Sequence, residues 1–525
     1  MLPTTFLAVI LACWSIFHLL HNFVTGNEYL GPICDRFLKK RSIFVTPFQV
    51  RYFTKKLNRY LAHFGRWRKL KVWFDAGILF AALAMLSSTI LLIHTLVKSF
   101  LDLNIFTTTP AVPSSQTPGF STNILSPYNI TTMYMQVLTV IVPGVNLPLN
   151  DLSYLLTAIL LSGILHELGH AVAATREGIE VNGFGIFLFV IYPGAYVDLN
   201  STDLNRANAR KQLRVYCAGV WHNFILCLIA CVLIFSLPFM LAPFYSQGGE
   251  GVIVTYQAQN SPLQGSSGIM VGDVVQHIGN CHVQESKTWF KCVNESRTLP
   301  QMGSCIKWNE LEKLTLKSSA GTLSDGHPDC CGVNPPPTHL CYHYKVSQKK
   351  QMFACLPGRT MMSFKDCTNN VDCGRHDQAV GVEGICAFPL LGDTTTRFMR
   401  LKILRYPNLP AQHVLYLGEP ADLVRFLTIS EYRPRWWWLP LRLPAVLLKF
   451  LQYMFSMSGA LAVLNIVPCY ALDGQWAFKS FLDFFYGRHP DLDNFKERVS
   501  TVVLCCGTLL VTLNVIFGFL NVFIK

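Results

Sequence analysis

The residues most able to do chemistry lie in one apolar stretch. Residues 155–174 read LLTAILLSGILHELGHAVAA and contain the motif His166-Glu167-Leu168-Gly169-His170. On a helix, positions i and i+4 share a face, so both imidazoles can bind one zinc ion. Glu167 lies about 100° around the helix from His166 and can act as general base toward the water that such an ion activates. The motif therefore predicts a metal-dependent hydrolase.

The setting of this motif strengthens the prediction. The rest of the stretch is apolar, and two histidines with a carboxylate are costly in a membrane-spanning helix, so they indicate a function there. A polar cluster that bridges neighbouring helices is the alternative. We favour a metal site because the motif and its position inside an apolar stretch agree.

Two imidazoles leave a catalytic zinc ion one protein ligand short. The extended motif HExxHxxGxxH is absent, because residues 171–178 contain no histidine. We therefore expect a distant acidic ligand, and Asp473 is the best candidate. Pro468 ends the preceding apolar stretch, and Gly474 lets the backbone approach closely. A helix N-cap role for Asp473 and Asp483 as the ligand remain alternatives.

The elements that must hold these residues are membrane-spanning helices. Of 525 residues, 51% are hydrophobic and 14% are charged, whereas soluble proteins have about a quarter charged residues. This composition excludes disordered, coiled-coil and collagen-like chains. A spanning helix needs about 20 mostly apolar residues, and six stretches qualify: 2–24, 74–97, 152–175, 211–242, 441–466 and 499–523. The first could be a cleavable signal peptide, but its start lacks basic residues, so we expect a retained span.

Two further apolar segments are irregular. Residues 133–148 are broken by Pro143 and Pro148, which predicts an interfacial or re-entrant segment. Residues 469–486 are short and contain charged side chains, so we expect a broken half-helix packed inside the bundle, where irregular backbone is tolerated.

The positive charge is concentrated in one loop. The net charge of the chain is +13, and residues 26–73 contain twelve Lys and Arg against Glu28 and Asp35, a net of +10. Such a loop is no nucleic-acid footprint spread over a binding face. The positive-inside rule predicts a cytosolic loop that contacts anionic lipid of the bilayer. An ordinary solvated basic loop is the alternative.

Two other loops have the composition of a lumenal compartment. Residues 102–132 are rich in Thr, Ser and Pro and contain a glycosylation sequon at Asn129. The loop 243–440 contains a second sequon at Asn294 and an even number of cysteines, which favours disulfides in an oxidising compartment over free cytosolic thiols. These cysteines are 281, 292, 305, 330, 331, 341, 355, 367, 373 and 386.

The motifs together resemble a known family, the intramembrane site-2 metalloproteases. Its signatures are HExxH in one core span and N-x-x-P followed by L-D-G in a later one, and both are present, the second as Asn465-Ile466-Val467-Pro468 and Leu472-Asp473-Gly474. Gly219-Val220-Trp221-His222-Asn223 matches the G-x-x-x-N-like pattern of a further core helix. With the basic loop and the cysteine-rich insertion, the whole chain is most similar to the animal members that act on membrane-bound transcription factors.

The resemblance implies a polytopic α-helical membrane protein with a site-2 protease core. His166, His170 and Asp473 would bind one zinc ion, and Glu167 would be the base. Asn223 and Asn465 would face the cleft and hold the substrate backbone or the oxyanion, whereas the alternative is that each hydrogen-bonds across helices.

The resemblance also implies the partners. The substrates would be membrane-anchored transcription-factor precursors with a single helix, of the sterol regulatory element-binding and endoplasmic-reticulum stress types, after a first cut by a lumenal protease. The enzyme would be a multi-pass protein of the Golgi and endoplasmic reticulum, with its active site within the membrane toward the cytosol.

The large loop begins like a PDZ-like domain. Gly251-Val252-Ile253-Val254 and Gly272-Asp273-Val274-Val275 are similar to its opening strands and turn. A disulfide-rich insertion, 281–386, interrupts the match, and residues 413–432 would supply the remaining strands and helix. Such a domain binds chain ends by strand addition, although a merely structural lumenal cap is the alternative.

We expect the chain to divide into four regions: 1–150, 151–242 with the zinc helix, 243–440, and 441–525 with the LDG motif.

Residues 183–200 alternate aliphatic and aromatic side chains, so we expect a β-hairpin or re-entrant loop beside the zinc helix. In the family, such strands can pair with an unwound substrate. If 74–97 crosses the membrane once, loop 26–73 is cytosolic, whereas a hairpin at 74–97 would make that loop lumenal.

Two other functions are alternatives to a protease. One is a zinc transporter, which should present further ligands or inverted repeats. The other is a disulfide-rich receptor, in which Glu167 would have no purpose.

Overall fold

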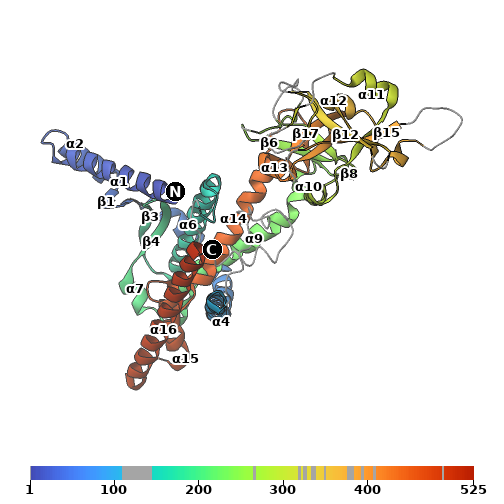
Figure 1. Ribbon diagram of the computed structural model, residues 1–525. Coiled ribbons are helices and arrows are strands. Elements are labelled where there is room, and N and C mark those ends of the chain that lie inside the picture. The colour runs from blue at the N-terminus through green and yellow to red at the C-terminus, as the bar shows by residue number, and fades with distance from the viewer. Residues whose placement is uncertain are drawn as a thin grey trace. The chain divides into compact units, whose positions relative to one another are not determined.

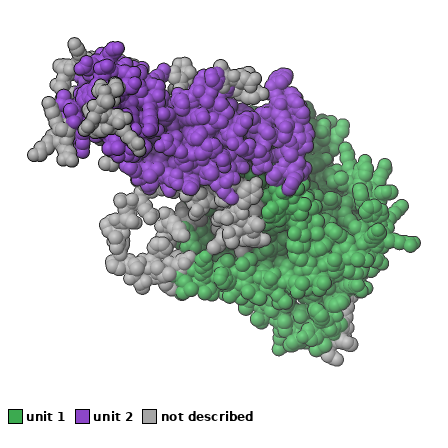
Figure 2. Space-filling view, turned by 90° about the vertical axis from the view of Figure 1, so that its right-hand side faces the viewer, with its two compact units in different colours: residues 1–237, 447–525 green, residues 238–446 purple. Residues whose placement is uncertain are grey.

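The computed structural model describes residues 2–108, 145–259, 261–263, 268–316, 321–322, 328–332, 338–347, 350–374, 384–391, 395–405, 410–487 and 490–524. The chain divides into two compact units (Figure 1, Figure 2). The first unit comprises residues 1–237 and 447–525, and the second comprises residues 238–446.

Six helices of the described residues are long and apolar enough to cross a membrane. They coincide with the six predicted stretches, so a multi-pass membrane protein is confirmed. Their elements are α1 (Leu2–Gly26), α4 (Leu70–Thr108), α6 (Leu152–Glu177), α8 (Ala209–Tyr216) with α9 (Ala218–Leu241), α14 (Leu443–Asn465) and α16 (Pro490–Ile524).

The segments with an irregular or uncertain prediction have different outcomes in the structure. The hairpin alternative at 74–97 is wrong, because α4 is one continuous helix of 39 residues. Of the stretch 133–148, residues 133–144 lie outside the described residues, and the short helix η2 (Leu149–Asp151) follows it. Within 469–486, a turn leads into α15 (Asp473–Tyr486), an amphipathic helix of 14 residues.

A four-stranded antiparallel sheet lies beside the helices of the first unit. Its order is β1 (Ile43–Thr46), β2 (Gln49–Thr54), β3 (Val181–Phe189) and β4 (Tyr192–Leu199). The two last strands form the hairpin that is one of the predicted alternatives for 183–200, and β4 packs along α6 (Figure 1). The basic loop supplies β1 and β2, with α2 (Gly31–Arg41) before them and α3 (Asn58–Phe64) after them.

Small side chains let the core helices of this unit approach closely. Ala81 of α4, Cys217 and Val220 beside or on α9, and Ala477 of α15 are buried in one apolar cluster. A Cβ at Gly169 would collide with the His222 ring and with the Ala218 carbonyl, so glycine lets α6 contact α9. The helix that carries the HExxH motif is therefore pressed directly against its neighbour.

The second unit is built on a sheet of order β17-β16-β7-β6-β18, with β8 paired to β7. One face of it packs with α10 (Ser286–Thr298) and α13 (Pro420–Phe426) around the fully buried Trp289. Residues 413–432, predicted to supply the remaining strands and helix, cover most of β17 and all of α13 and β18, but β16, a further strand of this sheet, lies before that range. Its strands are β6 (Val252–Gln257), β7 (Val274–Ile278), β8 (Cys281–His282), β16 (Arg397–Leu404), β17 (Gln412–Gly418) and β18 (Leu427–Ser430).

The cysteine-rich insertion forms a second sheet in this unit, of order β13-β12-β15-β9-β14. It has its own core, which includes Tyr342, Leu356 and Met361. The bounds are β9 (Gly303–Lys307), β12 (His339–Ser347), β13 (Lys350–Pro357), β14 (Asp366–Cys367) and β15 (Gly384–Pro389), with α11 (Trp308–Leu314), α12 (Gly358–Met361) and η3 (Asn370–Cys373). Short strands complete the unit: β5 (Tyr245–Gln247) with β19 (Tyr432–Pro434), and β10 (Gly321–Thr322) with β11 (Pro328–Asp329).

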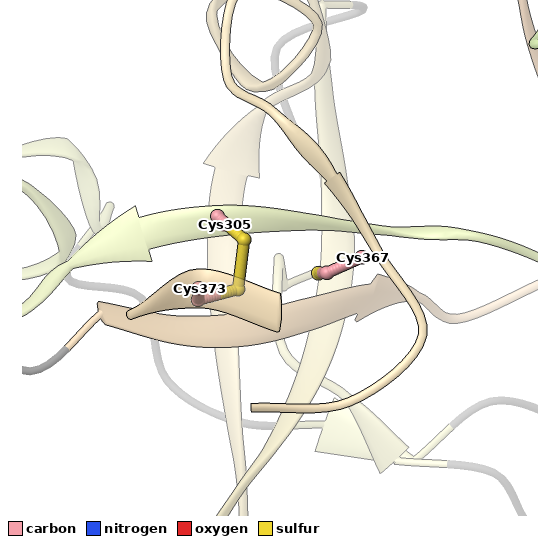
Figure 3. A group of neighbouring side chains, drawn as sticks. All are labelled: Cys305, Cys367 and Cys373. Carbon is pink, nitrogen blue, oxygen red and sulfur yellow. A yellow bond between two sulfur atoms is a disulfide. The ribbon is translucent and has the colours of Figure 1, made fainter. Parts of the chain in front are cut away.

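All ten cysteines of the insertion form disulfides, which confirms the predicted disulfide framework. The pairs are Cys281–Cys292, Cys305–Cys373, Cys330–Cys341, Cys331–Cys355 and Cys367–Cys386. Figure 3 shows Cys367 beside the Cys305–Cys373 bond. These three sulfur atoms cluster as metal ligands do, but each is already bonded to another sulfur, so the cluster is a pair of neighbouring disulfides.

Candidate metal centre and active site

His166, His170 and Asp473 converge on one point inside the first unit. The Nε2 atoms of the two histidines are 3.1 Å apart, and Asp473 Oδ2 lies 2.8 Å from that of His166 and 3.2 Å from that of His170. Both histidines are buried. Among the described residues, this is the group of three that brings two imidazoles and a carboxylate together, and its donor set is that of a catalytic zinc site.

The turn before α15 brings Asp473 to the histidines. Asp473 is the first residue of the helix, and Leu472 is its N-cap, so the N-cap alternative for Asp473 is wrong. A Cβ at Gly474 would collide with the carbonyl of Val467, so the glycine permits the close backbone approach. The alternative ligand, Asp483, lies more than two helical turns further along α15 and forms an ion pair with Lys496 at 2.7 Å.

His170 is oriented by a backbone carbonyl. Its Nδ1 donates to the carbonyl oxygen of Val215 at 2.8 Å, so the ring proton resides on Nδ1 and the Nε2 lone pair points to the convergence point. Val215 belongs to α8, and a network of ion pairs fixes the position of this helix. Arg214 donates to Asp75 at 2.7 and 2.9 Å and to Glu177 at 2.9 Å. Of these pairs Arg214–Glu177 is buried, and breaking a buried ion pair costs about 3–5 kcal/mol.

Asn223 lies behind His166. It is fully buried, and its side-chain amide is 3.0 Å from His166 Nδ1. With Nδ2 toward the ring, the Oδ1 atom has no hydrogen-bond partner among the described residues. With the amide turned by 180°, Oδ1 accepts the Nδ1 proton of His166, and the Nδ2 donor takes the place of the oxygen that had no partner. That arrangement leaves His166 Nε2 free for a metal ion.

Gly219 provides the space at the convergence point. A Cβ at this position would lie against Nε2 of both His166 and His170. The α9 backbone thus leaves a hollow where the three ligand atoms meet, and a metal ion fits that hollow. The residues present therefore match a resident metal in donor type, tautomer and space.

Glu167 points from α6 toward the neighbouring sheet. Its Oε2 accepts a hydrogen bond from the backbone N–H of Val197 at 3.0 Å. Val197 belongs to β4, the last strand of the sheet order, and this N–H points away from β3. The carboxylate therefore lies between the face of α6 that carries the candidate metal ligands and the outer edge of β4.

The remaining candidate residues lie at three different places. Asn465, at the end of α14, has its Nδ2 3.5 Å from His166 Nε2, which is next to the convergence point but too long for a strong hydrogen bond. Asn294 is exposed on α10. Asn129 lies outside the described residues.

Three groups that contribute to the site were not predicted from the sequence. The carbonyl of Val215 and the N–H of Val197 are backbone groups, which carry no signal in residue identity. Gly219 stands in the quoted G-x-x-x-N-like pattern, and its four-residue spacing to Asn223 could have indicated that both face the same neighbouring helix.

The comparisons agree with this geometry. The model of peptidase family M50 matches residues 154–513. The chain belongs to family M50. The "Membrane-bound transcription factor site-2 protease homolog" of Arabidopsis thaliana is 23% identical over 479 residues, 84% of this chain and 85% of that protein. No solved structure matches. The M50 match spans the HExxH motif and Asp473, so the chain is a membrane metalloprotease, as the motifs predicted.

Proposed function

We propose that the protein is a zinc-dependent endopeptidase that hydrolyses a peptide bond within or near a transmembrane helix of a membrane-anchored protein. The observation that carries this proposal is the convergence of His166, His170 and Asp473 on the hollow at Gly219, inside helices that can span a membrane. When bound, zinc would supply a Lewis acid for the scissile carbonyl and for water.

Glu167 would move the protons. It lies one residue from a candidate ligand and accepts a single backbone hydrogen bond, so its second oxygen is available to a water molecule. It takes a proton from the attacking water and delivers it to the leaving amine. Asn465, beside the convergence point, donates to the carbonyl oxygen as negative charge develops there. Asn223 serves a different purpose in this proposal, because it is buried behind His166 and orients that ring.

The edge of β4 would hold the substrate. A helix hides its carbonyls in i→i+4 hydrogen bonds, so a substrate must unwind before hydrolysis. Residues 195, 197 and 199 of β4 direct their backbone groups to the edge that faces Glu167, since Val197 donates to that side. An extended substrate that pairs with this edge lies next to the base and to the candidate metal ligands.

The specific substrates extend the proposal. We infer that they are membrane-anchored transcription-factor precursors of the sterol regulatory element-binding and endoplasmic-reticulum stress types, cut first in the lumen. The name of the Arabidopsis thaliana relative refers to a membrane-bound transcription factor, and the resemblance of the motifs supports the same substrate class. Release of the cytosolic part would be the outcome.

The orientation is part of the proposal. β2 pairs with β3 in the register Tyr52↔Ile186, so the basic loop lies on the side where α6 ends at Glu177. We place this side in the cytosol because the loop carries ten of the thirteen net positive charges. The disulfide-rich unit then faces the lumen of the Golgi and endoplasmic reticulum, where Asn294 would be glycosylated and Asn129 also, and its PDZ-like sheet could inspect the trimmed substrate.

The test is cleavage of a single-span reporter by the full-length protein in proteoliposomes. Glu167→Gln and Asp473→Asn should each reduce cleavage about 10²–10⁴-fold, and a zinc chelator should inhibit the wild type. Glu180→Gln, an exposed carboxylate just after α6, is the matched control and should keep full activity. Undiminished cleavage in Glu167→Gln contradicts the proposal, and zinc flux without cleavage would identify a transporter instead.

A further inference from the structure

A row of basic side chains crosses the sheet of the second unit. His282 of β8 is paired with His277 of β7, His277 with Lys402 of β16, and Lys402 with His413 of β17. Directly paired residues of an antiparallel ladder project from the same face. Four neighbouring strands thus present four bases in one line, which spans about 14 Å at roughly 4.8 Å per strand.

This basic row lies on the sheet face opposite the core, which near Phe398 and Arg400 packs against the cysteine-rich sheet. His282 and His413 are exposed, and His277 and Lys402 are partly exposed. The residues next to them along the strands, Ile278, Leu401, Ile403 and Val414, are buried in the core on the opposite face. The row is therefore accessible to a partner while the strands that carry it are anchored by the core.

The basic row has too few acidic neighbours. The rings of His277 and His282 are 4.6 Å apart. Arg400 stands two residues before Lys402 and adds a further cation near His413. Among the charged groups that act on His277 and His413, the acidic one is Asp366 of β14, and its carboxylate already binds Arg400 at 2.9 Å.

This imbalance has a measurable electrostatic consequence. Burial, His282, Lys402 and His413 lower the pKa of His277, and burial with Arg400 and Lys402 lowers the pKa of His413, which Asp366 partly offsets. Like charges placed directly opposite each other destabilise a sheet. Anionic groups bound along the row would remove this cost and favour the protonated imidazoles.

We propose that the basic row is a docking surface for an acidic polypeptide segment, which it binds through carboxylates and binds more tightly as the pH falls. Imidazolium, ammonium and guanidinium groups all form charge-assisted hydrogen bonds with carboxylates. The Arg400–Asp366 pair is an example of this contact at the end of the same face. Binding takes up protons, so its affinity increases with acidity until the carboxylates of the partner titrate near pH 4.

A metal ion is a poorer fit than a carboxylate partner. A stable transition-metal site needs three or four ligands. Among the described residues, no third histidine, cysteine or carboxylate joins the His277–His282 pair at ligand distance. The line of the four bases also suits an extended chain better than a single ion.

The experiment measures binding of a labelled ten-residue peptide of alternating Glu and Ala to the full-length protein in detergent, by fluorescence anisotropy. Binding should be about tenfold tighter at pH 5.8 than at pH 7.5. The triple variant His277→Gln/His282→Gln/His413→Gln should lose this pH dependence, and Lys402→Met should weaken binding several-fold at both pH values. Lys313→Gln, an exposed lysine of α11, is the matched control and should bind as the wild type does.

A charge-fixing variant guards against misfolding as an explanation. His413→Arg keeps a cation at one end of the row at every pH, so it should bind the peptide more tightly than the wild type at pH 7.5 and show a smaller pH effect. Binding that is independent of pH, or an equal loss in Lys313→Gln, overturns the proposal. Binding of polyphosphate but not of the glutamate peptide overturns it as well and identifies a phosphate-type ligand instead.

Discussion

Two groups of histidines in this molecule show how surroundings decide what an imidazole can do. His166 and His170 share a helix face, meet the carboxylate of Asp473, and each has an outer partner at Nδ1. The basic row of the second unit, by contrast, places the partly exposed His277 and the exposed His413 among cations on a sheet face. The first group is arranged to hold a metal ion with fixed tautomers. The second is arranged to change its charge when the pH or a partner changes.

The largest expected effect in this comparison of the two histidine groups comes from a substitution at Gly219. Gly219→Ala should abolish metal binding, because its Cβ would fill the hollow between the two Nε2 atoms. We expect the metal content of the purified protein to fall from about one ion per chain to nearly none, as measured by mass spectrometry of the bound metal. Gly163→Ala on α6 is the control, since the nearest atom to its Cβ would be 3.9 Å away. A full metal content in Gly219→Ala would refute the placement of the site.

A smaller effect is expected behind His166. Asn223→Ala removes the partner of Nδ1, and loss of such an outer partner typically weakens metal affinity about 10–100-fold. Asn223→Asp keeps an acceptor oxygen and should bind metal more tightly than Asn223→Ala. Competition with a chelator of known affinity gives the values. Asn514→Ala, which removes a partly buried amide that bonds Thr95 on another helix, should leave the metal affinity unchanged, and an equal loss there would refute the role of Asn223.

The smallest effect concerns the stability of the second unit. The pKa of His277 is lowered in the folded state, mainly by burial and by the neighbouring bases. The unfolded state therefore takes up a proton first as the pH falls below about 6.5, and the free energy of unfolding decreases in that window. We expect a loss below about 1 kcal/mol between pH 7 and 5.5. His277→Gln should make it smaller.

Hydrogen exchange of the β7 and β16 amides, corrected for the intrinsic rate at each pH, measures this stability change in the full chain. The amides of β12 and β13 in the other sheet serve as the internal reference. Protection of β7 that does not change with pH, or that changes equally in His277→Gln, would contradict the assignment.

The sequence predicted those parts of the molecule that rest on local spacing. The six apolar stretches, the i and i+4 histidines and the L-D-G turn are each contained in a few consecutive residues. The strands β1 and β2 were not predicted, although Ile43-Phe44-Val45-Thr46 has strand-forming residues. The high positive charge of the surrounding loop suggested lipid contact instead of a sheet.

Other features depend on register between distant segments. The alignment of His277 with Lys402 requires strands more than one hundred residues apart to meet in one particular register. The cysteines pair over separations of 11 to 68 residues, and their partners likewise depend on how the strands of the insertion are arranged. No local pattern specifies that register. The partners Val215 and Val197 are also invisible in the sequence, because they contribute backbone groups that every residue type possesses.

The path of the chain through the second unit has a consequence for its variability. The chain leaves the main sheet after β8 and returns at β16, which pairs with β7 beside the point of departure. Four of the five disulfides lie between these two points, inside the departing segment. A segment anchored in this way can gain or lose length without moving the strands that frame it. The cysteine-rich part is thus held together by its own cross-links, independently of the register of the strands that frame it.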